Sequence, residues 1–197
     1  DSHILAFIVK YTLVSEEGFM STANTKLANS LKELKKIQGK GRRVFKGNEL
    51  SVKHRARLNN SGFIQKITKG WWMIHNPDAP EGDTTLWYAS FWEFCAAYCN
   101  DRFGDEWYLS PQESLSLQAE NSIVPNQVVI YTPKGSNNQI NLPFDTSLYD
   151  LKHKDKLNNQ DAFIYEGLRL HTPEAALVKV PTDFYKSNSI EVQIALN

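Results

Sequence analysis

The first periodic pattern in the chain lies between residues 25 and 38. Apolar side chains recur there at spacings of three or four, at Leu27, Leu31, Leu34 and Ile37. This spacing predicts an amphipathic helix, with capping residues in 21–25 before it and Gly39 and Gly41 at its end. Further upstream, residues 4–14 are apolar and β-branched, and they fit a strand or the start of a buried helix equally well.

A shorter helix is predicted over residues 52–60. Ser51 is a good N-cap for it, and Gly62 ends it. We expect Val52, Ala56 and Leu58 to face inward. The basic side chains are then expected to point mostly outward: Lys53, His54, Arg55 and Arg57. Before this helix, residues 44–45 predict a short buried contact, and residues 47–50 predict a turn leading into a short helical turn.

Residues 63–74 have the pattern of a β-hairpin. Residues 63–67 alternate enough to form a strand, Lys69 and Gly70 supply the turn, and residues 71–74 form the return strand. The predicted order is that of a winged helix-turn-helix: a helix, a turn, a short helix, a basic helix and a hairpin. Such a fold lays its basic helix in the major groove of DNA. Winged helices also serve as protein-interaction modules, so the order alone leaves both uses open.

The second part of the chain begins after a polar stretch. Pro and Gly residues in 76–83 mark a linker, and a long apolar helix is expected from Thr84 or Thr85 to about Phe103. The two cysteines of the chain, Cys95 and Cys99, lie on one face of this helix. Two further ligands at a plausible spacing are missing, so small core residues are expected there rather than a zinc site.

The remaining residues alternate between short strands and short helices. Strands are expected at 107–109, 127–132, 139–142, 148–151, 163–165 and 168–171, and helices at about 111–120 and 173–177. Residues 110–113 have a capping-box pattern. The chain from Pro181 is expected to be irregular, and its apolar end predicts that the natural chain continues past Asn197.

The predicted fold class is therefore α+β. An N-terminal winged helix-turn-helix is expected over residues 1–75, a linker over 76–83 and a small mixed α/β domain over 84–197.

The net charge of zero hides two halves of opposite sign. Residues 1–75 hold 14 Lys and Arg against 5 Asp and Glu, a balance of +9, and residues 76–197 hold 8 against 17, a balance of −9. A basic segment of this kind favours a polyanionic partner such as double-stranded DNA. The alternative is that the two halves neutralise each other by packing together.

This charge pattern selects a set of residues predicted to bind DNA. Groove readout is expected from Lys53, His54, Arg55 and Arg57, and phosphate anchoring from Lys40, Arg42, Arg43 and Lys66. Ser51 and Lys69, at the start of the basic helix and in the hairpin turn, complete the predicted set.

The chain lacks the common signatures of catalysis. No phosphate-binding Gly-rich loop, dinucleotide fingerprint or nucleophile elbow is present, and the five histidines lack ligand spacing. We therefore expect no enzyme activity, no catalytic residue, no cofactor and no metal. The first residues lack a secretory signal, and the longest apolar run, Ile4–Val9, is too short to cross a bilayer. These features predict a cytoplasmic protein with no membrane partner.

Three blocks of the chain resemble the AbiEi-type antitoxin family, in that family's order. Residues 57–74, with their Ser-Gly-Phe-Ile-Gln and Lys-Gly-Trp-Trp segments, resemble its winged-helix opening. Residues 109–117 resemble its "S-x-x-S-A-L-x-L-H" block, and residues 166–177 resemble its "T-P-E-R-A-L" segment. Ala175 stands at the position of the Arg in that last motif, so the role of that Arg does not carry over.

The resemblance is closer still to the N-terminal region of certain bacterial Fic-family proteins. It runs through residues 61–65, 87–94 and 133–137. The Fic signature His-Pro-Phe-x-Asp/Glu-Gly-Asn-Gly-Arg does not occur in the chain, so Fic catalysis is not implied.

These resemblances imply a function beyond DNA binding alone. The AbiEi likeness implies an antitoxin that neutralises a nucleotidyltransferase-like toxin and represses its own operon. The Fic likeness implies a DNA-binding or regulatory segment ahead of an adenylylating domain. The predicted function is a DNA-binding transcriptional regulator of antitoxin type, bound to its own promoter and to a cognate toxin or Fic domain. The alternative is a protein-interaction module that neutralises a toxin or controls a Fic domain without binding DNA.

Overall fold

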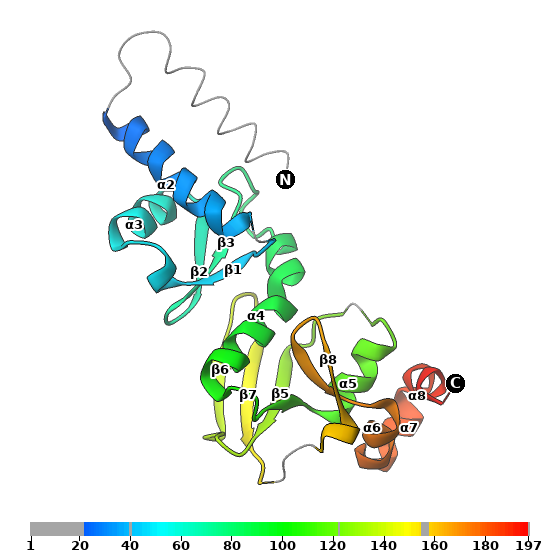
Figure 1. Cartoon of the computed structure of the whole chain (residues 1–197). Coiled ribbons are helices and arrows are strands. Elements are labelled where there is room, and N and C mark those ends of the chain that lie inside the picture. Colours follow the sequence, from blue (N-terminus) through cyan, green and yellow to red (C-terminus); the bar gives the residue numbers. More distant parts are fainter. Residues whose placement is uncertain (1–21, 40, 122, 155–157, 197) are drawn as a thin grey trace. The chain divides into compact units, whose positions relative to one another are not determined.

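The computed structural model describes residues 22–39, 41–121, 123–154 and 158–196 (Figure 1). Residues 4–14, with their predicted strand or buried helix, lie outside this part. The chain divides into two compact units, Asp1–Ser90 and Phe91–Asn197, which we call unit 1 and unit 2. The division falls inside helix α4 (Thr85–Phe103), beyond the segment 76–83 that the sequence predicts as a linker.

The contacts of the first turns of α4 explain where unit 1 ends. Nη1 of Arg43 donates a hydrogen bond to the carbonyl oxygen of Ala89, 2.8 Å away, which ties these turns to unit 1. The sequence predicts Thr84 or Thr85 as the cap of this helix. Thr84 directly precedes the helix, and its carbonyl accepts from the backbone N of Tyr88 at 3.0 Å. The carboxylate of Asp83 also accepts from the backbone N of Thr85 at 2.9 Å. Residues 76–83 form turns ahead of this cap.

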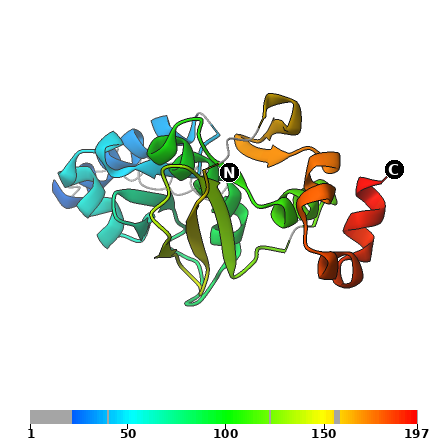
Figure 2. The ribbon, with the colours of Figure 1, turned by 90° about the horizontal axis from the view of Figure 1, so that it is seen from below.

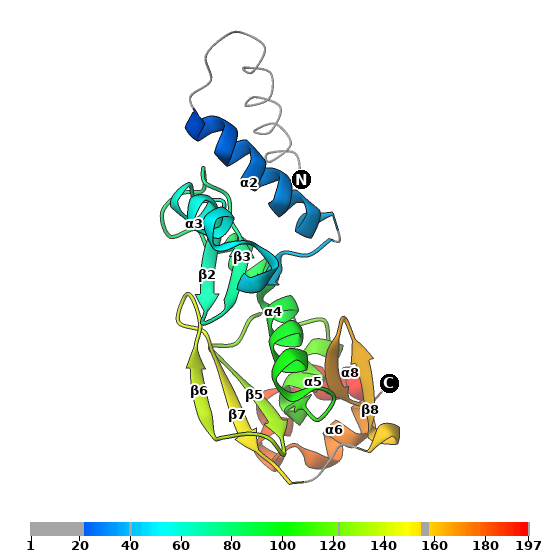
Figure 3. The same ribbon diagram turned by 60° about the vertical axis from the view of Figure 1, so that its left-hand side comes forward.

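In its described residues, unit 1 combines helices α2 and α3 and the first turns of α4 with a small antiparallel sheet (Figure 3). Its elements are α2 (Thr22–Gln38), β1 (Val44–Lys46), the 3-10 turn η2 (Gly47–Glu49), α3 (Val52–Asn60), β2 (Ile64–Thr68) and β3 (Trp71–Ile74). The strand order is β1-β3-β2. The predicted helices and hairpin are confirmed, and the register of the hairpin shifts between Lys66 and Thr68.

The core of unit 1 forms between the helices and the sheet. The predicted apolar stripe of α2 contributes Leu31, Leu34 and Ile37, all buried. The other buried members come from the strands and connections and from α3: Phe45, Leu50, Leu58, Phe63, Ile64 and Ile74. Each large apolar side chain buried in this way stabilises the fold by roughly 1.5–3 kcal/mol.

Helix α3 is rotated relative to the sequence prediction. Val52 is 71% exposed and Ala56 is also exposed, whereas Leu58 is fully buried. The expectation that Val52 and Ala56 face inward is therefore wrong. Leu58 sets the inner face, and with 3.6 residues per turn the positions three and four residues earlier, Arg55 and His54, share that face. Burying the larger Leu58 outweighs burying the two shorter side chains.

Unit 2 holds the rest of α4 and two sheets. The four-stranded sheet has the order β4-β5-β7-β6, with β5 and β7 parallel and the other pairs antiparallel. Its strands are β4 (Tyr108–Leu109), β5 (Gln127–Thr132), β6 (Asn138–Asn141) and β7 (Ser147–Lys152), with α5 (Pro111–Gln118) after β4. A short 3-10 turn, η3 (Asn159–Asp161), precedes the hairpin of β8 (Ala162–Tyr165) and β9 (Leu168–His171). The mixture of helices and mainly antiparallel sheets confirms the α+β class.

The C-terminal residues are helical, so the expected irregular end is wrong. Helices α6 (Pro173–Lys179), α7 (Thr182–Ser187) and α8 (Ser189–Ala195) follow one another, drawn from orange to red in Figure 2. Leu177, Phe184 and Val192 from these helices pack with Leu115 of α5 in one apolar cluster. Each of α7 and α8 offers a single buried side chain, which is too few to produce a readable period in the sequence.

Candidate nucleic-acid interface

Helix α3, which carries four of the ten predicted DNA-binding residues, begins at a capped N-terminus. Oγ of Ser51 accepts a hydrogen bond from the backbone N of His54, 3.3 Å away. A serine in this position stabilises a helix by about 1 kcal/mol. Ser51 therefore has a structural task at the helix end, and it remains exposed to solvent.

Two of the predicted groove-reading residues turn toward α2. Nη1 of Arg57 donates to Oγ of Ser30 at 2.8 Å and to the carbonyl oxygen of Lys26 at 3.0 Å. Nδ1 of His54 lies 2.9 Å from the same Oγ. The Ser30 hydroxyl donates its own proton to the Lys26 carbonyl at 2.9 Å. Its two lone pairs are therefore available to accept one hydrogen bond from Arg57 and, when His54 carries its proton on Nδ1, a second one from His54. Ser30 thus joins α2 to α3.

Arg55 turns to the other side, toward η2 and the hairpin. Its guanidinium donates to the carbonyl oxygens of Gly47 and Leu50, and it lies 5.7 Å from the centre of the Trp72 ring. A Cβ on Gly47 would lie 3.0 Å from Nε1 of Trp72 and 3.1 Å from Nη1 of Arg55, so a larger residue there would make these two side chains give way by a few tenths of an ångström. The arginine that the sequence assigns to the groove therefore fixes α3 against β3 and η2.

The two arginines before β1 have partners inside unit 1. Arg42 pairs with Glu49 through two contacts, Nη1 to Oε2 at 2.6 Å and Nη2 to Oε1 at 2.8 Å, and it also donates to the carbonyl of Val44. Glu49 thus offsets one of the predicted anchoring charges. Arg43 is exposed and reaches the carbonyl of Ala89.

Three predicted lysines present their ammonium groups to solvent. Lys53 on α3, Lys66 on β2 and Lys69 in the hairpin turn are all exposed, and no hydrogen bond or ion pair to them occurs among the described residues. The remaining predicted anchor, Lys40, lies outside the described residues. Exposed ammonium groups on a helix and a hairpin are suited to contacting phosphates.

The sequence prediction missed two sets of residues. Ser30 lies three residues after Leu27 and four before Leu34, so it stands on the apolar stripe of α2, and a polar residue on such a stripe marks a buried contact. The solvent-facing side of α3 consists of Val52, Lys53, Ala56, Asn59 and Asn60, and of these only Lys53 was predicted. Taking Leu58 as the centre of the inner face would have identified this side.

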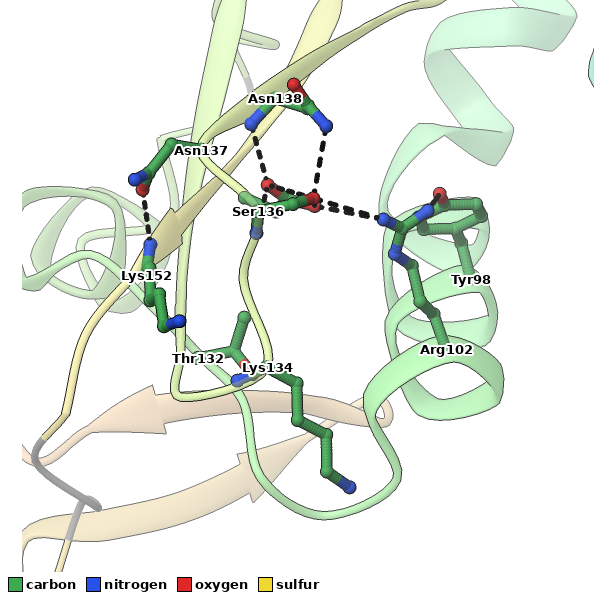
Figure 4. A network of polar contacts seen from close by, with 9 residues as sticks. Tyr98, Arg102, Thr132, Lys134, Ser136, Asn137, Asn138 and Lys152 are labelled. Atoms are coloured by element: carbon green, nitrogen blue, oxygen red, sulfur yellow. Dashed lines mark hydrogen bonds and ion pairs between the residues drawn. The ribbon is translucent and has the colours of Figure 1, made fainter.

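Unit 2 contains a buried carboxylate that holds a loop. Asp150 on β7 is fully buried, and its Oδ1 accepts from the backbone N of Asn138 at 2.8 Å and of Ser136 at 3.1 Å. Its Oδ2 accepts from Oγ of Ser136 at 3.1 Å and from Nη2 of Arg102 at 3.2 Å. Figure 4 shows Ser136, Asn138 and Arg102, which all contact this carboxylate. With every lone-pair direction occupied by a protein donor, the arrangement is suited to structure rather than to catalysis.

The two cysteine thiols of unit 2 are buried. Burial raises the pKa of the Cys95 and Cys99 thiols, which keeps them protonated and weakly nucleophilic. Within the described residues, no group of three or more His, Cys, Asp or Glu side chains could hold a metal ion. No helix in the described part of the chain is long and apolar enough to span a membrane.

Comparison of the chain with models of known protein families, with curated proteins and with solved structures finds no match.

Proposed function

We propose that unit 1 is a winged helix-turn-helix that binds double-stranded DNA, and that the protein is a transcriptional regulator of antitoxin type. The observation that carries the proposal is the element order α2-β1-η2-α3-β2-β3 with the strand order β1-β3-β2. In a winged helix of this arrangement the last hairpin forms the wing and α3 is the recognition helix. The second helix is reduced to the turn η2.

The charge of the same segment supports the proposal. Residues 1–75 carry a balance of +9, and the exposed lysines lie on the two elements that a winged helix brings to DNA. Lys53 approaches DNA from the recognition helix, and Lys66 and Lys69 approach it from the wing. Arg43 anchors phosphates, as do Arg42 and Lys40 in the predicted basic loop. His54, Arg55 and Arg57 hold α3 at the angle that the groove requires.

The resemblance to AbiEi-type antitoxins and to Fic-associated segments suggests the biological setting. In this proposal the DNA is the promoter of the protein's own operon in a bacterial cytoplasm, and unit 2 engages a cognate toxin or a Fic domain.

The test is a salt titration of the full chain with a duplex from its own promoter, with non-specific duplex as competitor. We expect binding that prefers the promoter and weakens linearly as log salt rises. Undetectable binding at low salt would contradict the proposal.

A second candidate function is protein binding by unit 2 without any DNA contact. The observation that favours it is the exposure of apolar side chains on the C-terminal helices, with Val178 86%, Ile190 69% and Leu196 70% exposed. Co-purification with a neighbouring toxin or Fic domain would support this function, provided that Val178→Ser with Ile190→Ser abolishes the complex. A complex that persists in this double variant would contradict a role for these side chains.

A further inference from the structure

The solvent-facing side of α3 contains no guanidinium group. Both arginines of the helix donate their hydrogen bonds inward, Arg57 to α2 and Arg55 to η2. The residues left on the outside are Val52, Lys53, Ala56, Asn59 and Asn60. Lys53, Ala56 and Asn60 follow one another at spacings of three and four, so they form one line along the helix.

We infer that this outer face of α3 reads A·T base pairs in the major groove, an inference that rests on the proposed DNA-binding function. A thymine presents a methyl group in the groove, which apolar side chains contact, and an adenine presents N6 and N7, which the amide of an asparagine matches with two hydrogen bonds. Val52 and Ala56 supply the apolar contacts, and Asn59 and Asn60 supply the amides.

The side chain that most often reads guanine is arginine, through O6 and N7. Nη1 of Arg57 could reach a base only by giving up its hydrogen bonds to the Lys26 carbonyl and to the buried Ser30 hydroxyl. Arg55 could do so only by leaving the Gly47 carbonyl and the Trp72 ring. Lys53 is the one outward cation of the helix, and its charge strengthens binding to any duplex.

The surroundings of the face agree with duplex DNA as its occupant. The face lies in a segment with a balance of +9, and Lys66 and Lys69 on the neighbouring hairpin are exposed. The face itself carries no carboxylate, so it offers no repulsion to phosphates.

The experiment is a selection of bound duplexes from a random pool with the full chain, followed by anisotropy titrations of the enriched site. In these titrations single thymines are replaced by uracil and single adenines by 7-deazaadenine. We expect A·T pairs at the selected core. Removing one contacted thymine methyl should weaken binding about fourfold, and removing one contacted adenine N7 should weaken it about fivefold or more.

The variants Asn59→Ala and Asn60→Ala complement the modified DNA, with Asn29→Ala on the exposed side of α2 as the matched control. At least one of the two α3 variants should lose the adenine preference and become insensitive to 7-deazaadenine, and the control should keep both. Circular dichroism checks that each variant is folded.

The outcomes separate this inference from the proposed function. Steeply salt-dependent binding to duplexes with G·C cores, or binding that ignores both base analogues, would overturn the A·T readout and leave DNA binding intact. Failure to bind any duplex at low salt would overturn both.

Discussion

Nη1 of Arg57 on α3 and Oγ of Ser30 on α2 meet at 2.8 Å in unit 1. Ser30 is fully buried, and its hydroxyl also contacts His54 and the Lys26 carbonyl. The contact supports the rotation of α3 that the buried Leu58 sets, and with it the choice of side chains that face solvent. An arginine that the sequence assigns to DNA readout thus helps to determine which other residues α3 presents to solvent.

The first prediction concerns the joint between α2 and α3, by which we mean the contacts of Ser30 with Arg57 and His54. Ser30→Ala removes the acceptor shared by Arg57 and His54 and leaves their donors facing an apolar methyl group. We expect the free energy of unfolding, measured by urea denaturation, to fall by about 1–3 kcal/mol. Thr25→Ala, an exposed position on the same helix, is the control and should change it by less than about 0.5 kcal/mol. Equal effects of the two substitutions would show that the joint adds no stability.

The second prediction separates positioning from DNA contact. Arg57→Ala should lower the free energy of unfolding by about 1–3 kcal/mol because it breaks the contacts to α2. Lys53→Ala should leave stability within about 0.5 kcal/mol, but reduce the slope of log affinity against log salt by about one. Lys179→Ala, an exposed lysine of unit 2, should change neither quantity. A Lys53→Ala variant with an unchanged salt slope would remove Lys53 from the interface.

A third prediction concerns the close approach at Gly47. The new Cβ of Gly47→Ala would lie 3.0 Å from Nε1 of Trp72 and 3.1 Å from Nη1 of Arg55, so one or both side chains must shift. We expect a loss of about 1–2 kcal/mol in stability and a change in tryptophan emission. Gly39→Ala is the control, because its Cβ would meet nothing closer than 3.4 Å. Unchanged emission and stability in Gly47→Ala would show that the pocket accommodates a methyl group.

The elements of the protein were more predictable from the sequence than the orientations of its side chains. Ser51 and Gly62 bound α3 as the sequence predicts, because capping is a local interaction between neighbours in the chain. The inward turn of Arg57 depends on Ser30, 27 positions away in the chain, and no local pattern encodes that distance. Asp150 is similar, since it reads as an ordinary polar strand residue until the loop at 136–138 closes over it.

Helix α5 shows the same limit at a smaller scale. The capping-box pattern of residues 110–113 is half realised, because Oγ of Ser110 accepts from the backbone N of Glu113 at 3.2 Å. The backbone N of Ser110 donates instead to the carbonyl of Val129 on β5, at 3.1 Å. The backbone N–H of Ser110, which would donate to the Glu113 carboxyl in a complete capping box, is thus used by the strand β5. The Glu113 carboxyl lies in largely buried surroundings without this donor.

A fourth prediction follows from those surroundings. Burial raises the pKa of Glu113 to about 7 from an ordinary 4.5, so the folded chain holds this proton more tightly than the unfolded chain. The stability that this provides is present at low pH and is lost as pH rises through about 7. Glu113→Gln is neutral at every pH, and it should be more stable than the parent at pH 8 by roughly 2 kcal/mol or more. Urea denaturation across the pH range from about 5 to 8 measures the difference, which should shrink toward the acidic end.

His171 adds a second readout to the same experiment, because its contribution to stability changes with pH in the direction opposite to that of Glu113. Burial lowers the pKa of His171 to about 4 from 6.5, so its contribution to stability is lost as pH falls between those values. The two groups oppose each other in the parent, and Glu113→Gln should uncover the acid sensitivity due to His171. Glu81→Gln, at an exposed carboxylate, should leave the pH profile unchanged. A Glu113→Gln profile parallel to that of the parent would contradict a buried, protonated Glu113.

The last prediction concerns the loop held by Asp150. In Asp150→Asn the side-chain oxygen can keep the two backbone donors at Ser136 and Asn138, but the new NH₂ group would face Nη2 of Arg102, which is itself a donor. We expect a loss of about 1.5–3 kcal/mol, and a larger loss of about 3–5 kcal/mol in Asp150→Ala, where Arg102 also loses its buried counter-charge. Asp145→Asn is the matched control, because Asp145 is exposed and asparagine tolerates its φ of 56°. Adding Arg102→Met to Asp150→Asn removes the facing donor and should restore part of the loss.

Because the network lies within unit 2, none of these variants should alter the salt dependence of DNA binding. A variant that lost DNA affinity in proportion to its lost stability would show instead that the two units fold as one.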